Sequence, residues 1–350
     1  MQVNVRRAQV ITVTLGGQRG MTLIELVVAI LISIVILAAG FTALVTTEKA
    51  SRANEQTVDT QQNARIAMDL IARDIRGAGM GMIGVIGACP TAVVPADQTP
   101  AGADTGPDTI SLVTPTGSGT WTLAGAVGAS GAGFNQLVLS SGAAGAVANL
   151  QSMGMGNGSI LNIGGAVSGT VSAFDVNAGT INLSNSVPPP ATFPAGTPVY
   201  LLQCITYSIG TTSAACSGGS SPCLLRNGVP VVDGIENIQF AYGCDGCVAA
   251  INGGVPDGVI DDQNGNNSFD QADFVTNSLW TTGASTIKLV QVSIVARQLG
   301  GEQGFGEGRQ AGLYSPPSLQ VSDHTMNLAG TQQFRRRLLT RTIELRNARL

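Results

Sequence analysis

The sequence predicts an α+β protein in which one long N-terminal α-helix packs on an antiparallel β-sheet with large glycine-rich loops. Residues 26–47 contain no ionisable side chain, and residues 48–79 continue with apolar side chains at helical spacing. Later segments alternate apolar and polar residues, as β-strands do. The 46 glycines, 11% charged residues and 4% aromatic residues are typical of a turn-rich β body and disfavour a helical cytosolic enzyme.

Residues 21–47 are long and apolar enough to cross a membrane. About 20 apolar residues at ~1.5 Å per residue span the hydrocarbon core of a bilayer. Glu25 lies at the start of this run, where a carboxylate costs roughly 2.5–3.5 kcal/mol and needs a positive partner. Cleavage between Gly20 and Met21 would create such a partner, because an α-amino group is largely protonated at neutral pH. The alternative is an ordinary signal anchor whose Glu25 lies at the level of the lipid headgroups.

Residues 48–79 are predicted to continue the same helix, because no proline interrupts them. Four apolar side chains recur on one face, namely Ala64, Met68, Ile71 and Ile75. Three charged side chains are expected to point elsewhere, namely Asp69, Arg73 and Asp74. Gly77 is the first of three closely spaced glycines that end the helix.

The N-terminal residues resemble the type IV prepilin signal. In this sequence Arg19 and Gly20 precede Met21-Thr22-Leu23-Ile24-Glu25 and the apolar helix. The resemblance implies that a membrane aspartyl peptidase cuts after Gly20 and methylates the new N-terminus at Met21. It also implies that Glu25 pairs with the amine of a neighbouring subunit during filament assembly. Met21 departs from the phenylalanine that is commoner at its position.

The chain accordingly divides into a prepilin leader at residues 1–20, a transmembrane and assembly helix at 21–47, its amphipathic continuation at 48–79 and a β-rich domain at 80–350. Removing the leader removes three arginines and no acid, so the formal net charge changes from −4 to −7. An acidic mature chain is a poor general binder of nucleic acid. DNA is therefore an unexpected partner, although six arginines occur in the last sixteen residues, namely Arg335, Arg336, Arg337, Arg341, Arg346 and Arg349.

The domain after residue 80 begins with a low-charge region to about residue 200, rich in glycine, alanine, serine and threonine. No lysine or arginine occurs between Arg76 and Arg226. We expect a loop-rich β region with short strands at residues 109–113, 136–139, 179–183 and 199–207. Alternation predicts two further strands around Phe240 and Val292, and a closing strand lies in the middle of residues 334–350.

The end of the helix and the tail resemble one subclass, the PilW-type minor pilins. The segments concerned are residues 61–79 and Glu344-Leu345-Arg346-Asn347. This resemblance implies a minor pilin that primes a type IV pilus or is incorporated into it, with other major and minor pilins and prepilin peptidase as partners. Two alternatives remain, a J-type pseudopilin of a type II secretion system and a filament-tip adhesin that binds through the low-charge region. The inner membrane holds such a chain before assembly, and the pilus at the cell surface holds it afterwards.

All six cysteines follow the apolar helix, and they are Cys89, Cys204, Cys216, Cys223, Cys244 and Cys247. An even set is expected in an oxidising compartment, so the body is placed in the periplasm or outside the cell. Six cysteines allow 15 pairings. We expect two local disulfides, Cys216–Cys223 and Cys244–Cys247, which leaves Cys89 with Cys204. A redox dithiol or a zinc site at Cys244–Cys247 lacks the surrounding motif.

Residues 262–273 predict a calcium loop. Oxygen-bearing side chains occupy positions 1, 3, 5, 7, 9 and 12 of this loop, namely Asp262, Asn264, Asn266, Ser268, Asp270 and Asp273. Asn267 replaces the usual glycine, Asp273 replaces the usual glutamate, and no paired amphipathic helices flank the loop. The expectation is therefore a calcium clip on a β-domain rather than an EF-hand, with Asp257 or Asp261 as substitute ligands. The alternative is a solvated turn rich in Asp and Asn.

Catalysis is not expected, so the chain is predicted not to be an enzyme. His324 is the single histidine, and a hydrolase triad would depend on this residue, which we expect at the surface. No phosphate-binding glycine loop opens a helix. No catalytic cofactor is therefore expected.

Overall fold

The structure is a computed structural model of the chain. It describes residues 20–96, 106–116, 121–128, 133–140, 143–187, 191–216, 222–247, 254–275, 286–299 and 315–347. The chain divides into two compact units, residues 1–54 and residues 55–350. Residues 1–19 of the expected leader lie outside the described residues.

The first element is the predicted long helix. Helix α1 (Leu23–Gly77) is continuous over 55 residues. Within the second unit it buries one stripe, and the four apolar residues predicted for this stripe are each at most 3% exposed. Gly79 then turns the chain at φ +75°, and a Cβ at this position would lie 2.8 Å from the Cβ of Ala92. A side chain is therefore excluded where the helix gives way to the first strand.

All strand pairs among the described residues are antiparallel, which confirms the α+β class. The largest sheet has the order β1 (Val93–Ala96), β2 (Thr109–Thr116), β7 (Val199–Gly210), β4 (Ile160–Ile163), β5 (Val167–Asp175), β6 (Thr180–Val187) and β3 (Phe134–Val138). A hairpin of β8 (Cys223–Arg226) and β9 (Val229–Asp233) pairs with β7. The second sheet has the order β10 (Ile235–Asp245), β11 (Thr286–Arg297) and β14 (Arg336–Glu344).

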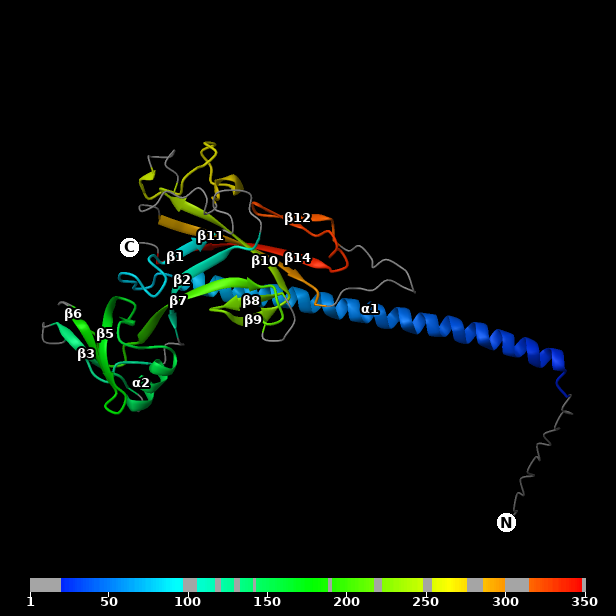
Figure 1. Ribbon diagram of the computed structural model, residues 1–350, viewed down its shortest axis with the longest axis horizontal. Coiled ribbons are helices and arrows are strands. Elements are labelled where there is room, and N and C mark those ends of the chain that lie inside the picture. Colours follow the sequence, from blue (N-terminus) through cyan, green and yellow to red (C-terminus); the bar gives the residue numbers. More distant parts are fainter. Residues whose placement is uncertain are drawn as a thin grey trace, which may run out of the picture. The chain divides into compact units, whose positions relative to one another are not determined.

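The main core lies between α1 and the two sheets. It joins Ile71 and Ile75 of α1 to Tyr207 of β7 and Phe240 of β10. Alternate residues of β11 face this core, because a strand turns successive side chains to opposite sides. Val290 lies opposite Tyr242 on one neighbouring strand and Ile343 on the other, and all three are at most 1% exposed. The second half of α1 is therefore part of the body (Figure 1).

The low-charge region has a core of its own. Helix α2 (Ala143–Ser152) lies with β3, β5 and β6 in the green part of Figure 1. Leu150 packs there with Leu137, Ile181 and Leu201, each at most 1% exposed. The four short strands expected in this region are confirmed as β2, β3, β6 and β7, but the expectation of a loop-rich region missed β1, β4, β5 and helix α2. Burial of apolar side chains, and not pairing of charges, therefore stabilises this region.

A small hairpin of β12 (Ser318–Val321) and β13 (His324–Asn327) completes the described strands. His324 is only 6% exposed, so the expectation of a surface histidine is wrong. Buried and exposed side chains alternate along β13, and His324 and Met326 are the buried ones. Val321, Met326 and Leu328 form a small core with Val295 of β11.

Candidate functional site

The N-terminal end of α1 carries the residues expected to direct processing and assembly. Gly20 and Met21 are exposed immediately before the helix, and Met21 is 64% exposed. The hydroxyl oxygen Oγ1 of Thr22 accepts the backbone N–H of Glu25 at 3.3 Å. This is one half of a capping box, in which a threonine and a glutamate three residues later satisfy the free N–H groups of a helix start. This role of Thr22 was not predicted from the sequence.

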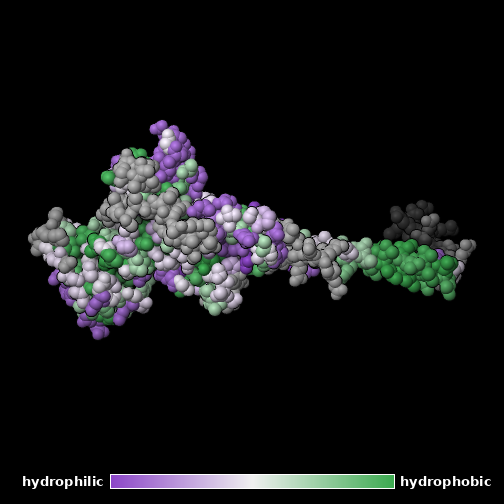
Figure 2. All heavy atoms as spheres, turned by 45° about the horizontal axis from the view of Figure 1, so that its top comes forward, coloured by the Kyte–Doolittle hydropathy of each residue, from purple (hydrophilic) through white to green (hydrophobic). Residues whose placement is uncertain are grey.

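The first half of α1 is a continuous apolar surface. Leu23, Leu31 and Leu37 are each more than half exposed. The most apolar 18-residue window of α1 has no residue buried inside the chain. Figure 2 shows this stretch as an unbroken hydrophobic surface. Exposure of an apolar surface of this extent to water is unfavourable. The side chains of the first half of α1 can therefore be buried only in lipid or against other apolar helices.

A buried polar cluster fastens the second half of α1 to the body. Asp74 is only 8% exposed, so the expectation that it points away from the body is wrong. Its Oδ2 accepts the hydroxyl of Tyr207 at 2.6 Å and the Nε–H of Arg226 at 3.1 Å. Arg226 is the first basic residue after Arg76, and it pairs with the one buried acid of α1.

This cluster also shifts the protonation of its members. Burial, and then the hydrogen bond to the Asp74 carboxylate, raise the pKa of Tyr207 well above its ordinary value of 10. Burial opposes the charge on Arg226, but Asp74 and Tyr207 more than offset this and raise the pKa of Arg226. The cluster therefore holds a neutral tyrosine between charged partners.

Stability is predicted to fall at high pH because of Tyr207. A pKa that is raised in the folded state stabilises the fold fully below the unfolded value of about 10, and this contribution is lost as the pH rises through the folded value. Urea unfolding of the full chain in detergent micelles between pH 8 and pH 11.5 tests this. The variant Tyr207→Phe should be less stable at pH 8 but lose less stability towards pH 11.5. An equal slope in both proteins would contradict the prediction.

Two arginines of the tail contact acids of the same chain. Arg336 binds both carboxylate oxygens of Glu236, at 2.5 and 2.9 Å. Arg341 Nη1 lies 3.0 Å from Asp69 Oδ1 on α1. Arg349 lies outside the described residues. The described part of the tail therefore does not present a continuous basic row of the kind that binds a nucleic-acid backbone.

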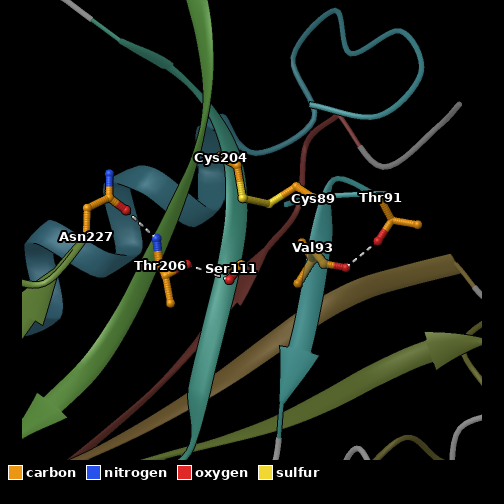
Figure 3. The surroundings of a disulfide bond; sticks show 7 residues. All are labelled: Cys89, Thr91, Val93, Ser111, Cys204, Thr206 and Asn227. Carbon is orange, nitrogen blue, oxygen red and sulfur yellow. Dashed lines mark hydrogen bonds between the residues drawn. A yellow bond between two sulfur atoms is a disulfide. The ribbon is translucent and has the colours of Figure 1, made fainter. Parts of the chain in front are cut away.

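Three disulfides connect the same pairs that the sequence analysis expects. They are Cys89–Cys204, Cys216–Cys223 and Cys244–Cys247. The first joins the segment after α1 to β7 across 115 residues of sequence. Figure 3 shows this bond beside the contact between Ser111 and Thr206. A link across so long a loop restricts the unfolded chain by about 4–5 kcal/mol in the chain-entropy model.

The Asp- and Asn-rich loop is folded around its own carboxylates. Asp262 accepts the backbone N–H groups of Gly265, Asn266 and Asn267, and Asn267 adopts a left-handed φ of 61°. The N–H of Ala272, and then the side-chain amide of Asn266, lower the pKa of Asp270. Four members of the expected ligand set are bonded within the loop: Asn264, Asn266 and Asp270 are exposed and Asp262 is half-buried, whereas Asp273 is buried.

Two aspartates outside the loop fix its position on β10. Asp261 accepts the N–H groups of Gly246 and Cys247, and Asp245 accepts those of Asp257 and Gly258. Among the described residues, no three His, Cys, Asp or Glu side chains form a group that could hold a metal ion. The expected set relies in addition on amide and hydroxyl oxygens, so calcium binding stays a prediction.

The double variant Asp262→Ala, Asp270→Ala tests this prediction. If the loop binds calcium, millimolar Ca²⁺ should raise the melting temperature of the wild-type chain and leave the double variant unchanged, because a ligand that binds only the folded state stabilises it. Asp175→Ala is a control, since this aspartate accepts N–H groups in a distant turn. A calcium response that survives in the double variant would remove the assignment.

Two models of known families match the chain, one at its N-terminal end and one over its C-terminal part. Residues 15–42 match the prokaryotic N-terminal methylation motif. Residues 206–347, somewhat less than half of the chain, match the family of type IV pilus-assembly protein W, PilW. No curated protein and no solved structure matches the chain.

The methylation motif, the exposed apolar half of α1 and the antiparallel body define the class: the chain is a type IV pilus-related pilin with an N-terminal helix that fits a membrane anchor. The second match narrows this class. Over residues 206–347 the chain is similar to the PilW family, and together with the methylation motif this similarity supports a type IV minor pilin of the PilW type.

Proposed function

We propose that this pilin is cleaved after Gly20, held in the inner membrane by residues 21–47, and then incorporated into a type IV pilus or used to prime one. The observation that carries the proposal is the apolar half of α1, in whose most apolar stretch no residue is buried inside the folded chain. Lipid covers such a surface before assembly, and the equivalent helices of other pilins cover it afterwards. Prepilin peptidase and other major and minor pilins are therefore its partners.

Glu25 gives the helix bundle its register. In a low-dielectric bundle an unpaired carboxylate is costly, and a protonated N-terminal amine of a neighbouring pilin is a suitable partner. The half capping box with Thr22 supports this role, because it keeps Glu25 in the first turn of the helix. The pairing then favours one axial offset between neighbouring helices over others.

The disulfides support a location of the body outside the cytoplasm. Oxidising compartments form and keep such bonds, whereas the cytosol reduces them. The body therefore faces the periplasm before assembly and the cell exterior in the pilus.

Deletion of the gene in the native host tests the role. We expect few or no pili on the deletion strain, restoration by the wild-type gene, and the chain itself in the sheared filament fraction. Normal piliation with lost protein secretion would contradict the proposal and favour the J-type pseudopilin. Normal piliation with lost surface attachment would contradict it in favour of the tip adhesin.

A further inference from the structure

A pocket lined by three consecutive arginines lies between α1 and the start of β14. Its volume is about 190 Å3. The residues that line it are Thr57, Thr60, Gln298, Arg335, Arg336 and Arg337, and we refer to it as the arginine pocket. None of these residues is acidic, and all of them belong to the second unit.

Arg336 forms the fixed wall of the arginine pocket. Its guanidinium donates to Glu236 and to Thr331, and its Nη1 also donates to the carbonyl oxygen of Phe334. Its side chain is only 3% exposed. Since these bonds use all five of its donors, Arg336 contributes positive charge to the pocket but has no free N–H for a ligand.

Arg337 is the available cation. Its side chain is exposed, and it forms no hydrogen bond or ion pair within the described part of the chain. A guanidinium offers two parallel N–H donors to a carboxylate or a phosphate. Thr60 forms the opposite wall on α1, where its hydroxyl donates to the carbonyl oxygen of Gln56 at 2.7 Å.

Gln298 carries a buried donor that has no hydrogen-bond acceptor, and this observation is independent of the arginines. It is 1% exposed, and its Oε1 accepts the backbone N–H of Arg335 at 3.2 Å. This bond fixes the orientation of the amide, because a carbonyl oxygen and not an NH2 group must face that donor. The Nε2 donor is then left buried without a hydrogen-bond partner. A buried unsatisfied donor costs about 1–3 kcal/mol, so it requires an explanation such as an unseen acceptor.

We infer that the arginine pocket binds an oxyanion, with Arg337 and the Gln298 amide as donors and Arg335 and Arg336 as the surrounding positive charge. The oxyanion is either free inorganic phosphate or a carboxylate side chain presented by a neighbouring pilin. A nucleic acid fits less well, because a duplex requires a row of phosphate contacts and the next described arginine along β14, Arg341, is paired with Asp69.

Isothermal titration of inorganic phosphate into the full chain in detergent micelles tests this inference, with sodium chloride at equal ionic strength as the reference. The wild-type chain should bind phosphate saturably, and Arg337→Gln should weaken the binding by at least about tenfold, because it removes a charged bidentate donor. The matched control is Arg346→Gln, an equal charge change at an exposed residue outside the pocket. Absence of saturable binding, or equal weakening in both variants, would overturn the inference.

A second variant replaces the unsatisfied Nε2 donor of Gln298. Gln298→Glu places a carboxylate of almost the same shape in the pocket, so phosphate binding should disappear in the folded variant. If this buried substitution prevents folding, the comparison of Arg337→Gln with Arg346→Gln still decides. Retention of wild-type phosphate binding by folded Gln298→Glu would also overturn the inference.

Filament incorporation then distinguishes the two sources of the oxyanion. Loss of the chain from sheared pili with Arg337→Gln, but not with Arg346→Gln, assigns the pocket to a carboxylate of a neighbouring pilin. Normal incorporation of both variants assigns it to a free oxyanion. The titration uses the isolated chain, so its result does not depend on the proposed role in the pilus.

Discussion

Replacement of Glu25 by alanine is expected to leave cleavage after Gly20 intact and to lower the amount of chain in sheared pili by at least about tenfold. The cleavage site lies outside the helix, whereas the carboxylate is needed to pair with a neighbour's amine in a low-dielectric bundle. Loss of a buried charge pair costs roughly 3–5 kcal/mol, enough for such a decrease. Immunoblots of membrane and filament fractions measure both steps.

Two variants serve as controls for Glu25→Ala. Glu25→Gln keeps the size of the side chain and removes its charge, so it should fail in the same way if pairing is the cause. Glu48→Gln removes an exposed acid of the same helix, which pairs with Arg52 at the helix surface, and should assemble normally. Normal incorporation of Glu25→Ala would contradict the assembly role of this residue.

The largest effect on stability is expected at Asp74. The variant Asp74→Ala leaves the Tyr207 hydroxyl and the Arg226 guanidinium without their acceptor. We expect a loss of about 2–3 kcal/mol in the free energy of unfolding, near the lower end for a buried pair because the Arg226 side chain keeps 29% exposure. Urea unfolding of the full chain in detergent micelles, followed by circular dichroism, measures this loss.

Asp69→Ala is the matched control on the same helix. Its partner is Arg341, and the Asp69 side chain is 75% exposed, so its removal should cost at most about 1 kcal/mol. Equal losses in Asp69→Ala and Asp74→Ala would show that burial of the Asp74 cluster does not govern stability at this position.

The sequence was sufficient to predict the helix and its buried face, because both depend on local periodicity. Apolar residues at helical spacing predicted which side of α1 meets the body. The burial of Asp74 was not predicted, because this residue lies at the border of the apolar stripe and its burial depends on two partners far along the chain. Tertiary contacts of this kind leave no periodic signal.

Two local signals were present but were not used. Thr22 and Glu25 have the spacing of a capping box. Asn227-Gly228 is a strong signal for a two-residue hairpin, and both residues adopt positive φ between β8 and β9. Both motifs concern turns and helix ends, where a few residues determine the geometry.

Helix α2 and the arginine pocket could not have been predicted in the same way. The α2 sequence is rich in alanine and carries no charged residue at its ends, so it lacks the usual markers of a helix start and end. The arginine pocket combines residues of α1, β11's end and β14, and its most informative member is a glutamine whose burial is visible only in the fold.

Intact mass and N-terminal sequencing of the chain purified from its native membrane test whether it is processed as a prepilin. We expect a chain that begins at N-methylated Met21 and lacks residues 1–20. A chain that retains residues 1–20 in cells with active prepilin peptidase would contradict it, and would leave Glu25 as a membrane acid without a partner.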